Sequence, residues 1–141
     1  MTTAAPSLAR SARSVRRAKT AAPRASETAI QKALVELIER TIHPNVVWTH
    51  IPNGELRAKA TAAKLKDMGV KSGWPDLIFI RPDDVSSGTS VLALELKADR
   101  GRASDEQKAV HERLRSCGVE VAVCFGLDEA MAQLKAWGII R

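Results

Sequence analysis

The chain has 141 residues, of which 45% are hydrophobic and 27% charged, and this composition favours one soluble globular domain over a fibrous or wholly disordered chain. No apolar run approaches the roughly 18 consecutive residues that a membrane-spanning helix needs, which argues against an integral membrane protein. The net charge of +6 comes from residues 1–25, which hold six basic and no acidic side chains, whereas the remainder holds 16 of each sign.

Residues 1–25 form a basic tail that is rich in Ala, Ser, Thr and Pro and poor in large apolar side chains. Such a segment buries too little surface to offset the entropy of ordering it, so we expect it to be disordered. Three roles stay open: a solvated tail, an arm that binds nucleic-acid phosphates, or an organellar transit peptide. We place the folded domain at residues 26–141. The basic residues of the tail are Arg10, Arg13, Arg16, Arg17, Lys19 and Arg24.

The first predicted element of the domain is a helix from Glu27 to about Thr41, with Ser26 as its N-cap. Its apolar residues recur at helical spacing and form one stripe. Glu27 falls in the middle of this stripe, whereas Glu36 lies on the opposite side. We therefore expect Glu27 to face the interior and Glu36 to face solvent.

The rest of the chain alternates between strand and helix patterns. Strands are predicted at 46–50, 76–80, 90–97 and 119–125, and helices at 55–67, 104–117 and 128–137. Three consecutive strands favour an antiparallel meander, and the helix between the last two strands favours a parallel pair. We expect an α/β fold, in the wider sense that includes α+β, with a mixed central sheet flanked by helices.

Cys117 and Cys124 are the only cysteines, and they lack the spacing of a zinc site. We interpret both as buried free thiols in a reducing compartment. The expected location is therefore intracellular, either cytoplasmic or associated with the nucleoid.

Charged side chains interrupt two of the predicted strands. Asp76 opens "DLIFI", and Glu95 and Lys97 share one face of "VLALELK" because side chains two residues apart in a strand point the same way. If the two strands pair, Asp76 lies beside Glu95 and Lys97, and Glu27 of the first helix supplies a third carboxylate to the same region. Converging carboxylates are hard oxygen ligands that suit Mg²⁺ or Mn²⁺. The alternative is that these residues only decorate strand ends, but their joint pattern favours metal-dependent phosphodiester hydrolysis, with Lys97 near the attacking water or the phosphate.

The segments "GWPD" (73–76) and "ELK" (95–97) resemble the motifs of the PD-(D/E)XK nuclease superfamily. More narrowly, the chain is similar to virus-type replication-repair nuclease (VRR-NUC) domains over about residues 26–137. The supporting segments, in chain order, are "SETAIQKAL", "HIPNGELR", "MGVKSGWPDL", "LELKADRGRASDEQ" and "GVEVAVC". The resemblance implies a restriction-endonuclease-like αβββαβ core.

The resemblance also implies roles for individual residues. Asp76 and Glu95 correspond to the metal ligands and Lys97 to the catalytic lysine. Glu27 corresponds to the acidic residue of the first helix, and Gln107 to the glutamine of the helix after the catalytic strand. One departure is Trp74, which stands where the family usually has a smaller apolar residue.

Gln107 has two possible roles. It shares the inward stripe of its helix with His111, which favours the active site, but Ser104 and Gln107 also have the spacing of a capping box. His111 itself we interpret as a core residue. Trp48 and Trp137 are interpreted in the same way, rather than as platforms for stacked bases.

A second group of polar residues surrounds the predicted turn after the first strand. His50 and the segment "IPNGELR" lie, in similar proteins, near the catalytic face. His50, Asn53, Arg57 and Lys71 are therefore predicted to contact DNA phosphates, and the alternative is that they belong to a solvated loop.

The sequence favours a Mg²⁺-dependent (or Mn²⁺-dependent) DNA nuclease. By resemblance only, the substrate is branched or four-way-junction DNA, the process is DNA repair, and a homodimer places two active sites across the junction. Two rival interpretations stay open. One is a non-catalytic nucleic-acid-binding module, and the other is a restriction-type endonuclease, for which so short a chain leaves little room for a recognition domain.

Overall fold

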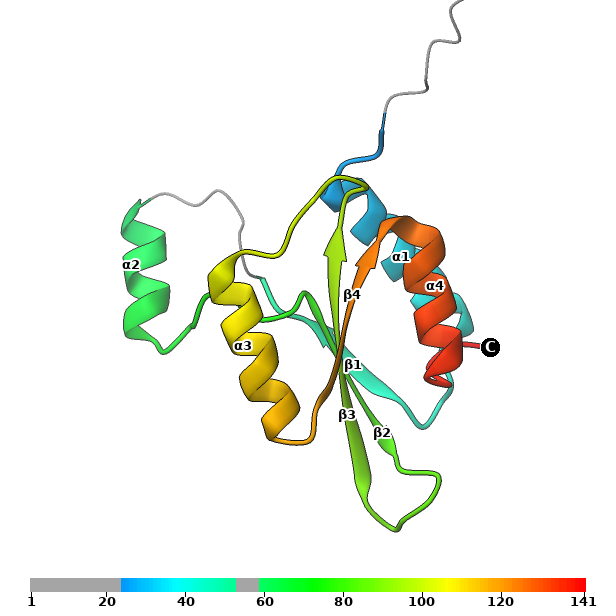
Figure 1. Cartoon of the computed structure of the whole chain (residues 1–141). Helices are drawn as coiled ribbons and strands as arrows, with labels where there is room; N and C mark the ends of the chain where they lie inside the picture. Colours follow the sequence, from blue (N-terminus) through cyan, green and yellow to red (C-terminus); the bar gives the residue numbers. More distant parts are fainter. Residues whose placement is uncertain (1–23, 53–58) are drawn as a thin grey trace, which may run out of the picture.

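The structure is a computed structural model, and it describes residues 24–52 and 59–141. Its elements follow the predicted order of helices and strands (Figure 1). They are α1 (Glu27–Thr41), β1 (Val47–His50), α2 (Lys59–Asp67), β2 (Leu77–Pro82), β3 (Thr89–Lys97), α3 (Asp105–Ser116), β4 (Glu120–Phe125) and α4 (Gly126–Ala136). The α/β prediction is confirmed, and most boundaries differ from the prediction by one or two residues, as fraying element ends generally do.

The four strands form one mixed sheet in the order β1-β2-β3-β4. The first three strands are antiparallel neighbours, and β4 runs parallel to β3. Short connections permit the antiparallel meander, whereas the return to a parallel strand requires a crossover, and α3 supplies it. The predicted meander with a parallel fourth strand is therefore confirmed.

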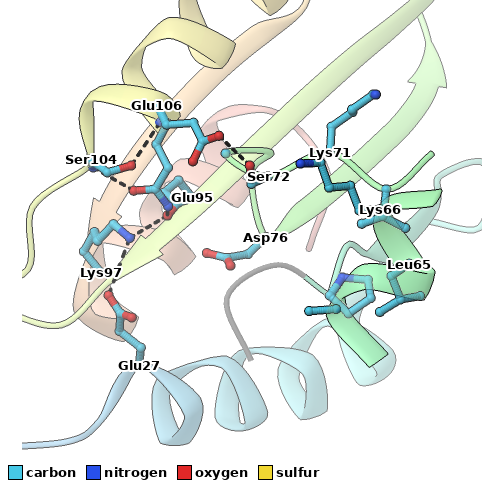
Figure 2. A pocket seen from close by; sticks show the side chains of 15 residues that line it. Glu27, Leu65, Lys66, Lys71, Ser72, Asp76, Glu95, Lys97, Ser104 and Glu106 are labelled. Atoms are coloured by element: carbon cyan, nitrogen blue, oxygen red, sulfur yellow. Dashed lines mark hydrogen bonds and ion pairs between the residues drawn. The ribbon is translucent and has the colours of Figure 1, made fainter. Parts of the chain in front are cut away.

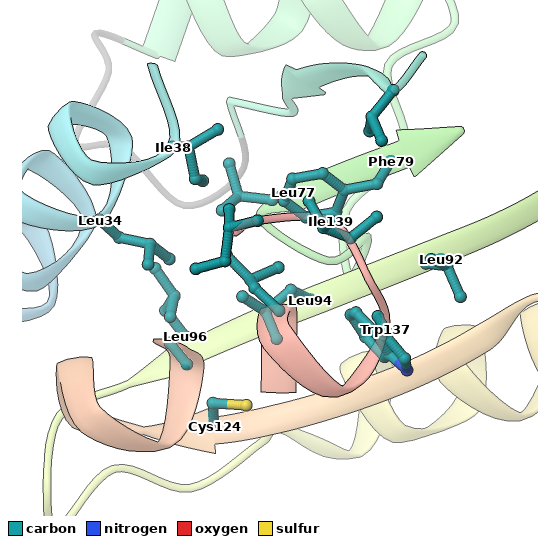
Figure 3. Close-up of a cluster of buried hydrophobic side chains, with 14 of the residues drawn as sticks. Leu34, Ile38, Leu77, Phe79, Leu92, Leu94, Leu96, Cys124, Trp137 and Ile139 are labelled. Atoms are coloured by element: carbon teal, nitrogen blue, oxygen red, sulfur yellow. The ribbon is translucent and has the colours of Figure 1, made fainter. Parts of the chain in front are cut away.

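One face of the sheet carries the hydrophobic core, which α1 and α4 cover (Figures 1 and 3). Alternate residues of β2 and β3 point to this face, where Leu77 is paired with Leu94. Leu34 and Ile38 of α1 and Leu134 of α4 are completely buried against it. The apolar stripe of α1 is thus explained by its contact with the sheet.

The other face of the sheet carries the charged residues. Because side chains alternate, Glu95 and Lys97 point away from the core, and β4 continues this face with Val123 and Phe125, their partners in the parallel register. α3 packs over β4 on this side. A polar site is therefore built between the sheet and α3, and the core behind it stays apolar.

α2 differs from the other helices because it has no buried residue. It packs closely against none of the other described helices and strands and stands apart from the sheet in Figure 1. The predicted helix began at residue 55, but the segment 53–58 lies outside the described residues. None of the helices within the described ranges is long and apolar enough to cross a membrane.

The prediction of two buried thiols is right for Cys124 and wrong for Cys117. Cys124 lies in β4 on the core face, whereas Cys117 caps the end of α3, where the chain turns at the surface. The tryptophans behave as predicted. Trp137 is buried, and Trp48 stacks on Phe79 with ring centroids 6.1 Å apart.

Candidate active site

A cavity of about 680 Å³ lies between α1, α2, the start of β2, the end of β3 and the start of α3. All five residues that were predicted to be catalytic line it: Glu27, Asp76, Glu95, Lys97 and Gln107. They come from four separate parts of the chain, and Figure 2 labels four of the five around one hollow: Glu27, Asp76, Glu95 and Lys97. The fold therefore brings together the whole predicted set.

Asp76 lies directly before β2 and is held in place by contacts with the neighbouring strands. Its Oδ2 accepts a hydrogen bond of 2.7 Å from the Leu96 N–H, so the carboxylate is held against β3 between Glu95 and Lys97. Its backbone oxygen accepts from the Ile51 N–H at 2.8 Å and lies 2.9 Å from Nδ1 of His50. Both the main chain and the side chain of Asp76 are thus positioned by neighbouring strands.

The turn that leads to Asp76 is held against α3 by Gly73. This glycine has a φ of +81°, and a Cβ on it would lie 3.0 Å from both the Glu106 oxygen and Cγ2 of Val110. Only glycine permits both the backbone conformation and this close approach. Ser72 donates a hydrogen bond to Glu106 beside it. The close packing of this turn on α3 sets the distance between Asp76 and the helix.

Glu95 and Lys97 form a buried ion pair at the floor of the cavity. Nζ of Lys97 lies 2.6 Å from Oε1 of Glu95, and the two residues are 8% and 1% exposed. The Gln107 amide donates a second hydrogen bond of 2.6 Å to the same oxygen, Oε1. One oxygen of the Glu95 carboxylate thus accepts from two donors.

The two roles that were considered for Gln107 are both present. Its Oε1 accepts from the Ser104 N–H at 2.9 Å, and its own N–H donates to Oγ of Ser104 at 3.1 Å, which completes the capping box. Its Nε2 meanwhile donates to Glu95. The amide side chain has an acceptor and a donor at opposite ends, so one residue starts α3 and contacts the site.

The site shifts the pKa values of its carboxylates upward. Burial raises the pKa of Glu95 to about 7, helped by the charges of Asp76 and Glu27 and opposed by Lys97. Burial also raises the pKa of Asp76, against the opposing hydrogen bond from Leu96. Ionisation of both carboxylates is therefore unfavourable in the absence of a cation. Perturbed pKa values of this kind are typical of functional sites.

The pKa of Lys97 is also raised, but for a lysine this favours the charged form. Burial by itself would lower its pKa, but the hydrogen bond to Glu95 and the charges of Glu95, Glu27 and Asp76 outweigh burial, and the pKa is raised. The side chain is therefore a cation at neutral pH. As a cation it can stabilise negative charge or orient a water molecule.

Glu27 faces the cavity rather than the packed interior that the helical stripe predicted. It is in the first turn of α1, beyond the end of the core, and its side chain is 50% exposed. Its Oε1 lies 3.7 Å from Nζ of Lys97 (Figure 2). Its position on the stripe directs it toward the site, and its place at the helix end leaves it open to solvent.

Asp76 and Glu95 fit a hard divalent cation. Mg²⁺ is commonly held by one or two carboxylates together with water and substrate phosphates, and a cation would offset the burial and the repulsion that raise both pKa values. Among the residues that the structure describes, no group of three or more His, Cys, Asp or Glu side chains has the spacing of a metal site. The fit therefore depends on the Asp76–Glu95 pair, with Glu27 beside it on the far side of Lys97.

Of the residues predicted to contact phosphates, Lys71 is exposed and lines the cavity together with Lys66 of α2. Asn53 and Arg57 lie outside the described residues. His50 is turned toward the protein instead, with Nδ1 2.8 Å from the Gln31 amide nitrogen and 2.9 Å from the Asp76 backbone oxygen. Its observed contacts therefore hold Asp76 in place.

The sequence interpretation missed the closeness of His111 to the site. His111 is buried in α3, and its Nε2 lies 4.0 Å from Oε2 of Glu95. Burial, with the charges of Arg115 and Lys97, lowers its pKa, so the ring is neutral at pH 7. The spacing of four residues did place His111 and Gln107 on one face of the helix, but no sequence pattern marks such a histidine as adjacent to a metal-ligating carboxylate.

Comparisons with known proteins agree with this geometry. The family model of the VRR-NUC domain matches residues 25–128. A solved structure described as a VRR_NUC domain protein has 27% identity and a TM-score of 0.61, and the match covers 80% of this chain and 88% of that one. A second, described as a VRR_NUC domain, has 23% identity and a TM-score of 0.49, with 79% and 97% covered. No curated protein matches.

The family match extends over most of the chain and includes every predicted catalytic residue. The solved VRR_NUC domain protein with 27% identity shares its fold with four-fifths of this chain. The chain therefore belongs to the VRR-NUC family of nucleases, and its substrate is a nucleic acid.

Proposed function

We propose that this protein is a Mg²⁺-dependent DNA nuclease of the PD-(D/E)XK type, which also accepts Mn²⁺. The observation that carries the proposal is the convergence of Asp76, Glu95 and Lys97 at the floor of one cavity, where burial raises the pKa values of both carboxylates. Buried charges without a function are costly to keep together. A cation and a phosphodiester give all three residues a partner.

Each residue of the cavity then has a defined part in hydrolysis. Asp76 and Glu95 would hold the divalent cation, with Glu27 beside them. When bound, the cation lowers the pKa of a coordinated water and offsets the charge that develops on the phosphodiester. The Lys97 ammonium orients the attacking water and stabilises the transition state, because it stays protonated. Gln107 keeps the Glu95 carboxylate directed at the cavity through its hydrogen bond.

We extend the proposal to branched or four-way-junction DNA cut by a homodimer, as in DNA repair. The dimer is supported by an exposed apolar pair at the edge of the sheet, where Val47 is paired with Ile80 and the two are 62% and 39% exposed. A second copy seated there would give one substrate two cavities.

The rival of a non-catalytic binding module is less well supported. The Glu95–Lys97 pair at 2.6 Å and the Gln107 donor keep the site ordered, and binding alone does not need buried carboxylates in a groove for a polyanion. A restriction-type endonuclease is also less well supported, because the described domain contains no second unit for sequence recognition.

A cleavage assay tests the proposal. Labelled duplex, flap, single-stranded and four-way-junction DNA are incubated with the protein and Mg²⁺, Mn²⁺ or EDTA. We expect metal-dependent cleavage, strongest on the junction, and a loss of at least about 100-fold in Lys97→Ala and Asp76→Asn. Lys135→Ala, an exposed lysine on α4, is the matched control and should cleave like the wild type.

Cleavage in EDTA, or in Lys97→Ala at the wild-type rate, would overturn the mechanism. Binding without cleavage of any substrate would favour the non-catalytic module. Light scattering on wild type and Val47→Lys tests the dimer separately, since a charge at the centre of the contact should yield monomers. A monomeric wild type would remove the dimer from the proposal.

A further inference from the structure

Two buried polar atoms face each other behind the cavity without a hydrogen-bond partner among the described residues: Oε2 of Glu95 and Nε2 of His111. The two residues are 1% and 2% exposed, and these atoms lie 4.0 Å apart. A buried polar atom without a partner usually costs about 1–3 kcal/mol. Two such atoms directed at each other therefore need an explanation.

The carboxylate of Glu95 is held unevenly. Oε1 accepts from both Lys97 and Gln107 at 2.6 Å, whereas Oε2 accepts from neither. Donors on one oxygen alone leave the carboxylate plane free to tilt about that oxygen. A donor on Oε2 would fix the plane.

His111 is placed to be that donor. It lies in α3 one turn after Gln107, so the helix that positions the first amide donor also positions the imidazole. A charge-assisted N–H···O bond is about 2.7–2.9 Å long, so the gap closes with a movement of roughly 1 Å. A separate cavity of about 400 Å³, which His111, Arg115 and Val123 help to line, lies beside the ring.

We infer that His111 is a positioning residue of the nuclease site, whose Nε2–H donates to Oε2 of Glu95 and fixes the carboxylate plane when a divalent cation binds. The inference rests on the proposed function, in which Glu95 holds that cation. Outer-shell partners of ligating carboxylates typically change metal affinity 10–100-fold when they are removed. A histidine that only fills the core would change stability and leave metal affinity as it is.

The test measures Mn²⁺ binding in the absence of DNA, by electron paramagnetic resonance, on wild type, His111→Leu and His111→Gln. Leu keeps an apolar side chain of comparable bulk but has no donor, whereas Gln retains an N–H. We expect Mn²⁺ affinity to fall 10–100-fold in His111→Leu and to recover most of the way in His111→Gln. His43→Leu, which removes a histidine outside the site, should bind Mn²⁺ like the wild type.

Unfolding by urea in EDTA accompanies each variant, so that a loss of folded protein is separated from a loss of affinity. Wild-type Mn²⁺ affinity in folded His111→Leu, or equal weakening in His111→Leu and His111→Gln, would overturn the inference. Asp76→Asn distinguishes this result from a failure of the proposed function. Mn²⁺ binding that is independent of Asp76 overturns both, whereas binding that depends on Asp76 and is unaffected by His111 overturns only the positioning role.

Discussion

Glu95 is the residue on which the site's electrostatics converge. It is almost completely buried, it accepts hydrogen bonds from Lys97 and Gln107, and its second oxygen faces His111. In the metal-free protein its ionisation is opposed by burial and by the neighbouring carboxylates. The same features that prepare it for a cation make its charge unfavourable until a cation arrives.

This gives a prediction for stability against pH. The pKa of Glu95 is about 7 in the folded protein and ordinarily about 4.5, so the folded state retains the proton over a range where the unfolded chain has lost it. Wild type should therefore lose stability as pH rises from 5 to 8, whereas Glu95→Gln lacks this loss. We expect the advantage of the Gln variant to grow by roughly 2–3 kcal/mol over that range.

The measurement is chemical unfolding of both proteins in EDTA at pH 5 and pH 8. Omitting metal is essential, because a bound cation would itself favour the ionised carboxylate. Stabilities that change in parallel with pH in the two proteins would show that the carboxylate ionises normally.

Gln107 allows its two roles to be separated. Ser104→Ala removes the hydroxyl of the capping box but leaves the donor to Glu95, whereas Gln107→Leu weakens the cap and removes the donor. Loss of a capping side chain costs about 1 kcal/mol, and we expect that cost in both variants. Cleavage should stay close to wild type in Ser104→Ala and fall about 10–100-fold in Gln107→Leu.

The test compares the cleavage rates and the unfolding free energies of the two variants. If the two variants cleave equally well, then Gln107 serves α3 alone and its contact with Glu95 is incidental.

At the scale of elements, the sequence predicted those features that depend on residues close together in the chain, such as helix ends and strand order. Helix α1 begins and ends where Ser26 and the apolar stripe indicated, and Ser26 accepts the capping hydrogen bond from Ala29. The meander and the parallel fourth strand followed from connection lengths. The predicted gathering of Asp76, Glu95 and Lys97 required only that β2 and β3 pair.

Contacts between distant segments could not be predicted from the sequence. The bond from the Leu96 N–H to Asp76 depends on the register of two strands, and the closeness of His111 to Glu95 depends on how α3 lies over β4. Neither contact produces a periodic pattern in the sequence. Glu27 was placed on the correct stripe, but its exposure depends on the core ending one turn later, at Ile30.

The turn between α2 and β2 offers a matched pair of glycines. Gly69 and Gly73 both have positive φ, at +94° and +81°, but a Cβ at Gly69 meets nothing within 4 Å, whereas at Gly73 it meets Glu106 and Val110 at 3.0 Å. Gly69→Ala should cost only backbone strain, about 1 kcal/mol. Gly73→Ala should cost more and also slow cleavage, because the turn must move away from α3 and takes Asp76 with it.

Unfolding free energies and junction cleavage of the two variants provide the comparison. Equal losses of stability with unchanged cleavage would show that the packing of this turn on α3 does not position Asp76.

At the scale of the whole molecule, the net positive charge and the predicted catalytic residues lie in different parts of the chain. Residues 1–25 supply the net positive charge, and the remainder is formally neutral. We expect deletion of residues 1–25 to weaken DNA binding and to reduce the slope of log affinity against log salt by up to roughly 5, since each of six cations can release about 0.9 counterion. The cleavage rate at saturating DNA should be unchanged, because no catalytic residue is removed.

Fluorescence anisotropy over a range of salt concentrations measures both affinity and slope. An unchanged slope would leave the tail as a solvated segment and assign DNA binding to the folded domain alone.

Helix α2 forms one wall of the cavity without contributing a buried residue to the hydrophobic core. α2 lines the site through Leu65 and Lys66, yet none of its residues is buried. Substitutions in α2 should therefore change the free energy of unfolding little, so this wall of the cavity can be altered without altering Asp76, Glu95 or Lys97. We therefore expect a library randomised over Lys59–Asp67 to yield folded proteins at high frequency, and variants with altered substrate preference if α2 contacts the DNA.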